Sequence, residues 1–286
     1  MNKSMTGAIL SPIDERDYPI CMAYEDKEIE IPEKFTTSFQ PPYAKQLCGN
    51  CVAQTIANIM EVMYYNITGV HEDFSVGFVY GNRTPEQYQG EGMTGRLACG
   101  NLCKDGNIKS KLFDNAGSAP SIIEAVNEFK QEFPNWKDYR YVPISYVRTE
   151  DIDEVKKFII KYNIPVMAIT EVASFSFGSG LHAMALYGWD KDTAIMQNSW
   201  GENHRQKIVK LPFDKIKEFW LILPFEIANF KDISTQHWAY KAIAKCVEKK
   251  VLLGYPDNTF APNKELTRAE IAVILYRMLR GKKNDE

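Results

Sequence analysis

The sequence lacks a long apolar run, an excess of basic residues and a dense set of cysteines. No stretch of about 18 consecutive apolar residues occurs among its 286 residues, so we expect no membrane-spanning helix. Lys and Arg number 34 against 37 Asp and Glu, and the net charge of −3 argues against nucleic acid as the main partner. Six cysteines are too few for a disulfide-dense scaffold of this length.

The N-terminus also lacks the apolar region of a secretory signal peptide. Only Ala8-Ile9-Leu10 precedes Ser11-Pro12, whereas a signal peptide needs about 7 to 15 apolar residues. The sequence therefore predicts no export signal at this end.

The overall composition is that of a folded protein. Apolar residues make up 45% of the chain and charged residues 25%, and the length fits one large domain or two ordinary ones. The first 45 residues are charged and interrupted by prolines, which predicts an extended segment with one short strand near residues 28–31.

Helical periodicity begins directly after this segment. Apolar residues three and four apart predict a helix from Cys51 to about Tyr65, with Asn50 as its N-cap and Gly69 after its end. The same signals predict three shorter helices, which are expected over residues 96–103, 121–133 and 151–162.

From residue 166 the spacing of apolar residues changes from the helical period to the alternation or continuous runs typical of strands. Strands are expected over residues 166–170, 182–189, 193–198, 207–211 and 219–223. A hairpin turn at residues 188–192 joins two of them and would bring His182 beside Asn198. Helices followed by an antiparallel sheet indicate an α+β fold.

The pattern changes once more near residue 228. Two amphipathic helices are expected over residues 238–250 and 267–280, with a turn at residues 254–258 between them. Thr267 and Glu270 have the spacing of a capping box at the start of the second helix. We therefore expect two domains, residues 1–227 and a small helical module over residues 228–286.

Cys48-Gly49-Asn50-Cys51 is a C-x-x-C sequence with three interpretations. It could be half of a zinc site completed by Cys99 and Cys103, a redox pair, or a reactive thiol at a helix N-terminus. The third is favoured, because the positive end of the helix dipole stabilises a thiolate at Cys51. A nucleophile of this kind needs a base and a group that orients the base, and the hairpin supplies His182 and Asn198.

These blocks resemble the three motif blocks of papain-like cysteine peptidases. The blocks are Gln46 with Cys48-Gly49-Asn50-Cys51, then His182-Ala183-Met184-Ala185, and then Asn198-Ser199-Trp200-Gly201. His182 and Asn198 follow Cys51 by 182 − 51 = 131 and 198 − 51 = 147 residues, within the family's spacing of about 130–150. The end of the domain, near residues 211–222, is similar to bacterial members.

The resemblance implies a fold, a reaction and a set of roles. The fold would be a helical subdomain packed on an antiparallel, barrel-like sheet, and the reaction would be hydrolysis of a polypeptide through an acyl-thioester without a metal or organic cofactor. Cys51 would be the nucleophile, His182 the base and then the acid, and Asn198 the orienting group shielded by Trp200. Gln46 would donate its amide to the oxyanion together with the Cys51 backbone N–H. A thiolate–imidazolium pair is expected in the resting enzyme.

The sequence departs from the family in four places. Gln46 lies five residues before Cys51 rather than six, and Val52 stands where an aromatic residue is common. A second Trp-Gly block after Asn198 is missing. The 50 residues before Cys51 are too few for the long helical inhibitory propeptide of eukaryotic members.

The other cysteines and histidines have less specific interpretations. The resemblance implies a disulfide from Cys48 to Cys99 or Cys103. Cys21 is a free thiol or, alternatively, part of an inhibitory plug that bonds to Cys51. The three remaining histidines are assigned surface or local polar contacts, and they are His71, His204 and His237.

The C-terminal module resembles a single S-layer homology repeat. The resemblance rests on Phe230-Lys231-Asp232, His237-Trp238-Ala239, residues 254–262 and Thr267-Arg268-Ala269-Glu270. It implies binding of secondary cell-wall polysaccharide, with Arg268 contacting acidic sugar groups and Trp238 stacking or packing. Because three such repeats usually cooperate, one repeat implies self-association, as in a homotrimer, or a packing module without sugar affinity.

Two other functions and an uncertain location stay open at this stage. The chain could be a catalytically idle surface protein that only binds wall polymer, or a transpeptidase or maturation enzyme for one dedicated partner. The repeat suggests the cell surface of a Gram-positive bacterium. The missing export signal leaves work inside the cell or release by lysis as alternatives.

Overall fold

A computed structural model describes residues 7–12, 14, 29–87, 90–115, 117–225, 230–233, 237–248, 251–255 and 259–281. Within these ranges no helix is both long enough and apolar enough to cross a membrane. The chain divides into two units, one of Met1–Met63 with His71–Phe225 and one of Tyr64–Val70 with Glu226–Glu286.

The first unit is built on a sheet of nine strands. The strands are β1 (Ala8–Ile9), β2 (Lys34–Thr36), β3 (Met93–Thr94), β4 (Tyr146–Thr149), β5 (Val166–Glu171), β6 (Leu181–Asp190), β7 (Thr193–Gln197), β8 (Ile208–Pro212) and β9 (Ile216–Ile222). The main path runs β3-β1-β6-β5-β9-β4, while β2 and β7 also pair with β6 and β8 pairs with β7. All pairs are antiparallel except β1 with β3.

The expected barrel-like sheet is therefore corrected to an open one. No recorded pair among the described residues joins the ends of the strand path into a ring. The antiparallel strands from β5 to β9 were expected. The strands β1 and β3, which form a short parallel edge, were not, because two residues are too few to show the alternating pattern of a strand.

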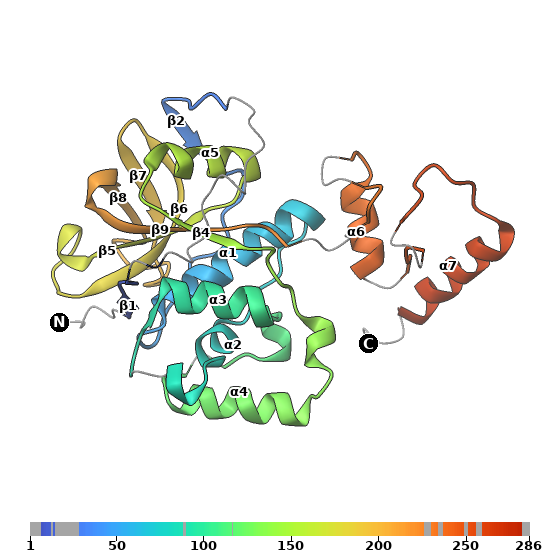
Figure 1. Ribbon diagram of the computed structural model, residues 1–286, viewed down its shortest axis with the longest axis horizontal. Helices are drawn as coiled ribbons and strands as arrows, with labels where there is room; N and C mark the ends of the chain where they lie inside the picture. Colours follow the sequence, from blue (N-terminus) through green and yellow to red (C-terminus); the bar gives the residue numbers. More distant parts are fainter. Residues whose placement is uncertain are drawn as a thin grey trace. The chain divides into compact units, whose positions relative to one another are not determined.

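Helices pack beside the sheet in the first unit. They are α1 (Cys51–Thr68), α2 (Val76–Gly81), α3 (Gly95–Asp105), α4 (Ser121–Glu132) and α5 (Ile152–Tyr162). Figure 1 shows α1 between the strands and the group of α2, α3 and α4, with α5 on the sheet side. The core contains fully buried aromatic side chains from both sides, which include Phe78, Phe158, Tyr187, Trp189 and Trp220.

Short 3-10 turns complete the unit, at Pro85–Gln87, Ser110–Leu112, Trp136–Tyr139, Val172–Ser174 and Phe213–Lys215.

The expected helices are present, with ends that differ from the expected ones by up to three residues, but several short elements differ. The strand expected near residues 28–31 is found later, as β2, and residue 28 lies outside the described residues. α2 and β4 had no prediction. α2 is only six residues long and is capped by Ser75, whose side chain accepts the N–H of Phe78 at 3.0 Å. The hairpin turn after β6 is confirmed, and Lys191 in it has a φ of 55°.

The second unit contains the two helices of the C-terminal module. They are α6 (Tyr240–Glu248) and α7 (Arg268–Gly281). The capping box at the start of α7 is present, because the Glu270 N–H donates to Thr267 Oγ1 at 3.2 Å and the Thr267 N–H donates to Glu270 Oε2 at 2.7 Å. Asp232 holds the loop between the helices, since its carboxylate accepts the N–H groups of Phe260 and Ala261 at 2.8 and 2.7 Å.

Candidate active site and glycan pocket

The predicted nucleophile lies where α1 meets the sheet. Cys51 is the first residue of α1 and is fully buried. Its sulfur accepts a hydrogen bond from the backbone of Ala183, which directly follows His182 in β6. The fold thus brings the start of α1 against the strand that carries the predicted base.

His182 and Asn198 are joined by a direct hydrogen bond. His182 Nε2 lies 2.8 Å from Asn198 Oδ1, and both residues are buried. Asn198 Nδ2 donates to the carbonyl of Gln206 at 3.0 Å, which turns the amide oxygen toward the ring. Nε2 must therefore carry the proton, and Nδ1 is left as the basic nitrogen.

Aromatic rings enclose this imidazole. The Trp200 ring lies 5.0 Å from the His182 ring, and the Phe175 ring lies 5.6 Å from Trp200. The His204 ring makes a T-shaped contact with Trp200 at 5.0 Å between ring centres, in the segment where the second Trp-Gly block is missing. Sequence reasoning identified Trp200 but not Phe175, which carries no motif and lies in the loop before β6.

Gln46 reaches the same region through the loop before α1. Its backbone N–H donates to the Ser199 carbonyl at 2.8 Å, and its Oε1 accepts from Ser199 Oγ at 2.6 Å. Its Nε2 donates to the carbonyl of Cys48 at 2.9 Å. The amide proposed for the oxyanion is therefore engaged with Cys48 in this structure.

Residues 7–11, which we name the N-terminal strap, cover the thiol. The backbone of Gly7 makes a hydrogen bond to the sulfur of Cys51, and the Gly7 carbonyl accepts from the Met93 N–H at 2.9 Å. Ala8 pairs with Met93 of β3 on one side and Leu181 of β6 on the other. The strap thus bridges the helical and the sheet sides directly over Cys51.

Both ends of the strap are tightly fitted. A Cβ on Gly7 would lie 1.8 Å from the carbonyl oxygen of Gly49, so only glycine fits there. At the other end, the Ser11 N–H donates to the buried carboxylate of Glu218 at 2.8 Å. The sequence predicted an extended segment here but not this contact, which depends on residues more than 40 positions away.

The expected thiolate–imidazolium pair is wrong for this closed form. Burial raises the pKa of the Cys51 thiol to about 11, although backbone hydrogen bonds from Ala183 and Gly7 act in the opposite direction. Burial also lowers the pKa of His182 to about 4, against the hydrogen bond that Nε2 donates to Asn198. Nδ1 of His182 has no hydrogen-bond partner among the described residues, so both groups are neutral at pH 7.

The remaining predictions for the C-x-x-C segment need correction. Cys48 forms no disulfide with Cys99 or Cys103. Cys48 instead donates to the Gly117 carbonyl at 3.5 Å. Cys21, and with it the alternative of a plug, lies outside the described residues.

Asn50 does not cap α1 through its side chain. It is fully buried, but neither atom of its amide has a hydrogen-bond partner in the described part of the chain. Its backbone carbonyl accepts the Gln54 N–H at 2.9 Å instead. An N-cap prediction assumes an accessible side chain that accepts an N–H of the first helical turn, whereas the Asn50 amide is buried next to Cys51.

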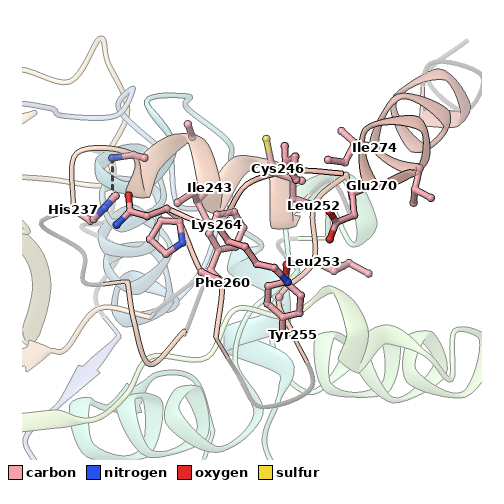
Figure 2. Close-up of a pocket in the computed structure, with 18 of the residues that line it drawn as sticks. His237, Ile243, Cys246, Leu252, Leu253, Tyr255, Phe260, Lys264, Glu270 and Ile274 are labelled. Carbon is pink, nitrogen blue, oxygen red and sulfur yellow. Dashed lines mark hydrogen bonds between the residues drawn. The ribbon is translucent and has the colours of Figure 1, made fainter. Parts of the chain in front are cut away.

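The second unit has a pocket of about 660 Å³ between α6 and α7. Figure 2 shows Ile243 and Cys246 of α6 on one side of it and Ile274 of α7 on the other, with Tyr255 and Lys264 nearby. The Lys264 ammonium lies 4.5 Å from the centre of the Tyr255 ring. The pocket therefore combines an apolar interior with a cation and an aromatic ring at its edge.

The two predicted glycan contacts differ in their relation to this pocket. Trp238 lines it and is 91% exposed, next to the ring of His237 at 5.9 Å. Arg268 is exposed at the start of α7 but does not line it. Lys264 and Arg277 are the cationic side chains among the lining residues, and sequence reasoning did not select them.

Comparison with known proteins identifies the C-terminal module. Residues 229–272 match the S-layer homology domain family. The chain is 40% identical over 60 residues to the outer membrane protein SlpA of Thermus thermophilus, and 48% identical over 51 residues to a cellulosome-anchoring protein of Acetivibrio thermocellus. These matches cover 21% and 18% of this chain but only 6% and 11% of those proteins.

Solved structures match the first unit. Xylellain, a cysteine protease from Xylella fastidiosa, superposes with a TM-score of 0.60 at 20% identity, over 77% of this chain and 96% of that one. The cysteine protease and lectin-like domains of Cwp84, a surface layer associated protein of Clostridium difficile, match at 0.51 and 16%, over 69% and 52%. The chain therefore has the fold of papain-like cysteine proteases followed by an S-layer homology module.

Proposed function

We propose that the protein is a cysteine peptidase that hydrolyses peptide bonds through Cys51, His182 and Asn198. Cys51 would attack the carbonyl carbon and form an acyl-thioester, while His182 Nδ1 takes the thiol proton and passes it to the leaving amine. Water would then hydrolyse the thioester. The observation that carries this proposal is the His182–Asn198 bond, because it fixes the tautomer whose Nδ1 is basic.

Gln46 would complete the site as an oxyanion donor with the Cys51 backbone N–H. Ser199 holds the Gln46 side-chain oxygen at 2.6 Å, and rotation toward a substrate would exchange the bond from Nε2 to the Cys48 carbonyl. The Gln46 amide would then exchange its hydrogen bond to the Cys48 carbonyl for a stronger one to the negative charge that develops on the substrate oxygen.

The N-terminal strap would have to leave before a substrate enters. Gly7 presents an N–H to the sulfur, and Met93 engages its carbonyl, so the nearest group is not an electrophile that Cys51 could attack. Departure of the strap would readmit water to Cys51 and His182. The Cys51 pKa would fall and the His182 pKa would rise, as an ion pair requires.

Labelling with an epoxide inhibitor of thiol peptidases tests the catalytic proposal. We expect one adduct on Cys51 in the chain from which residues 1–12 have been removed, and none in its Cys51→Ala variant. Cys246, on α6, is the internal control in the same digest. Absence of the adduct at Cys51 from a folded truncated chain would favour the idle surface protein instead.

For the module, we propose binding of secondary cell-wall polysaccharide at the pocket between α6 and α7. Trp238 would stack on a sugar ring, and cations near the pocket, including Lys264, would meet acidic groups. Arg268 would contribute from outside the lining. Sedimentation with purified wall polysaccharide should be weakened by Trp238→Ala and by Lys264→Ala, but not by Lys217→Ala, a control on the first unit.

Self-association of the module is the second part of this proposal. Six apolar or aromatic side chains of α7 are between 43% and 68% exposed, and they are Ile271, Val273, Leu275, Tyr276, Met278 and Leu279. All of them except Val273 lie on one side of the helix, and an apolar face of this kind favours contact with further copies, such as a trimer. Analytical ultracentrifugation should show a mass above the monomer that Leu275→Ser with Leu279→Ser reduces.

Polypeptide substrate, wall polymer and the family matches together favour a location at the cell surface. Fractionation of the native host tests this, with the cytoplasm as the contradicting location. Product analysis with an added amine acceptor separates hydrolysis from transfer, since a transpeptidase would give an amide of the added amine.

A further inference from the structure

A cluster of two carboxylates and one imidazole lies outside the active site. Glu61 is on α1, and His71 and Asp73 follow in the loop before α2. Their ligand atoms all lie within 4.8 Å of one another. His71 Nε2 is 3.3 Å from Glu61 Oε2 and 3.6 Å from Asp73 Oδ1, so one ring nitrogen faces both carboxylates.

Hydrogen bonding alone explains this geometry poorly. A single N–H on Nε2 can be directed at one oxygen only, and charge-assisted bonds of this type measure about 2.7–2.9 Å. In the described part of the chain, no Lys or Arg makes an ion pair with Glu61 or Asp73.

A bound metal ion accounts for the same distances. Zinc bonds to imidazole nitrogen and carboxylate oxygen at about 2.0–2.2 Å, so neighbouring ligands of a tetrahedral ion lie about 3.3–3.5 Å apart. The distances from His71 Nε2 to Glu61 Oε2 and to Asp73 Oδ1, 3.3 and 3.6 Å, are close to this separation between ligands. The exposed Asp73 side chain, at 73%, can turn to shorten the third edge.

The surroundings are already arranged to orient the ligands. The Phe74 N–H lies 3.4 Å from Glu61 Oε1, which leaves Oε2 to face the imidazole. The Phe39 ring packs against His71 at 5.7 Å. His71 also lines a cavity of about 500 Å³ with Tyr43 and Gln197, so water can reach a fourth coordination position.

We propose that Glu61, His71 and Asp73 form a binding site for a zinc-like divalent cation. Zinc would join the two places where the chain leaves the first unit, after Met63, and enters it again, at His71. Glu61 lies ten residues beyond Cys51 on the same helix, about 15 Å away, so the ion stabilises the fold rather than takes part in catalysis. The local polar contacts expected of His71 are present, and in this proposal they are those of a metal ligand, which the sequence did not lead us to expect.

Calorimetric titration of zinc chloride into the full chain, first stripped with a chelator, tests the site. We expect wild type to bind one more equivalent than His71→Gln, and Asp73→Asn to bind that equivalent at least tenfold more weakly. His237→Gln, in the other unit, is the matched control and should bind like wild type. Circular dichroism of the stripped variants checks that each is folded.

Cobalt(II) separates this site from the cysteines, which also bind zinc. Thiolate ligands give an intense near-ultraviolet band, whereas imidazole and carboxylate ligands give only weak visible bands. We expect weak visible bands that disappear in His71→Gln. Equal zinc uptake by wild type and folded His71→Gln, or a spectrum made up of thiolate bands alone, would overturn the proposal.

Discussion

The two units differ in where their apolar surface lies. The first buries most of its large apolar side chains, Trp189 and Trp220 among them, and even its predicted nucleophile is covered by the N-terminal strap. The second leaves the α7 face exposed and a pocket of about 660 Å³ open between its helices. The first unit covers its apolar surface with its own residues. The second presents apolar surface that a ligand or another copy of the chain would cover.

The sharpest consequence of this closure concerns the thiol. With a pKa of about 11, Cys51 is about one part in ten thousand thiolate at pH 7, and this fraction rises about tenfold for each pH unit. Iodoacetamide labelling of Cys51 in the full chain should therefore keep accelerating up to about pH 11. Mass spectrometry of the peptide gives the rate, and a plateau below pH 7 would show that the ion pair already exists.

A smaller effect is expected at the group that orients the base. Asn198→Ala removes the acceptor of the His182 Nε2 proton and lets the ring adopt either tautomer, so kcat on a peptide should fall at least tenfold. Asn203→Ala changes an exposed neighbour and should leave kcat unchanged. If both variants kept wild-type kcat, Asn198 would have no positioning role.

The smallest effects separate the two apolar surfaces. Phe158→Ala empties a buried position on α5 and should lower the free energy of unfolding of the first unit by about 3–5 kcal/mol. Leu275→Ala changes a side chain that is 53% exposed and should cost below about 0.5 kcal/mol in the monomer. Urea unfolding at low protein concentration measures both. Equal losses would mean that the α7 face is already packed.

The sequence predicted the features that depend on local periodicity or on a short turn. The hairpin at Lys191 brings His182 and Asn198 together, and the apolar spacing after Cys51 specifies α1. What it could not predict depends on distant partners. The strap is held where Ala8 pairs with Met93 and Leu181, and the neutral state of Cys51 follows from burial that no local pattern encodes.

Removal of the strap tests the central claim most directly, which is that Cys51 is a peptidase nucleophile closed off by residues 7–11. The measurement is kcat/KM for a fluorogenic peptide with the full chain, the chain lacking residues 1–12, and that shorter chain with Cys51→Ala. We predict at least a tenfold gain on truncation and its complete loss with Cys51→Ala. A folded truncated chain without activity, or activity that survives Cys51→Ala, would contradict the account.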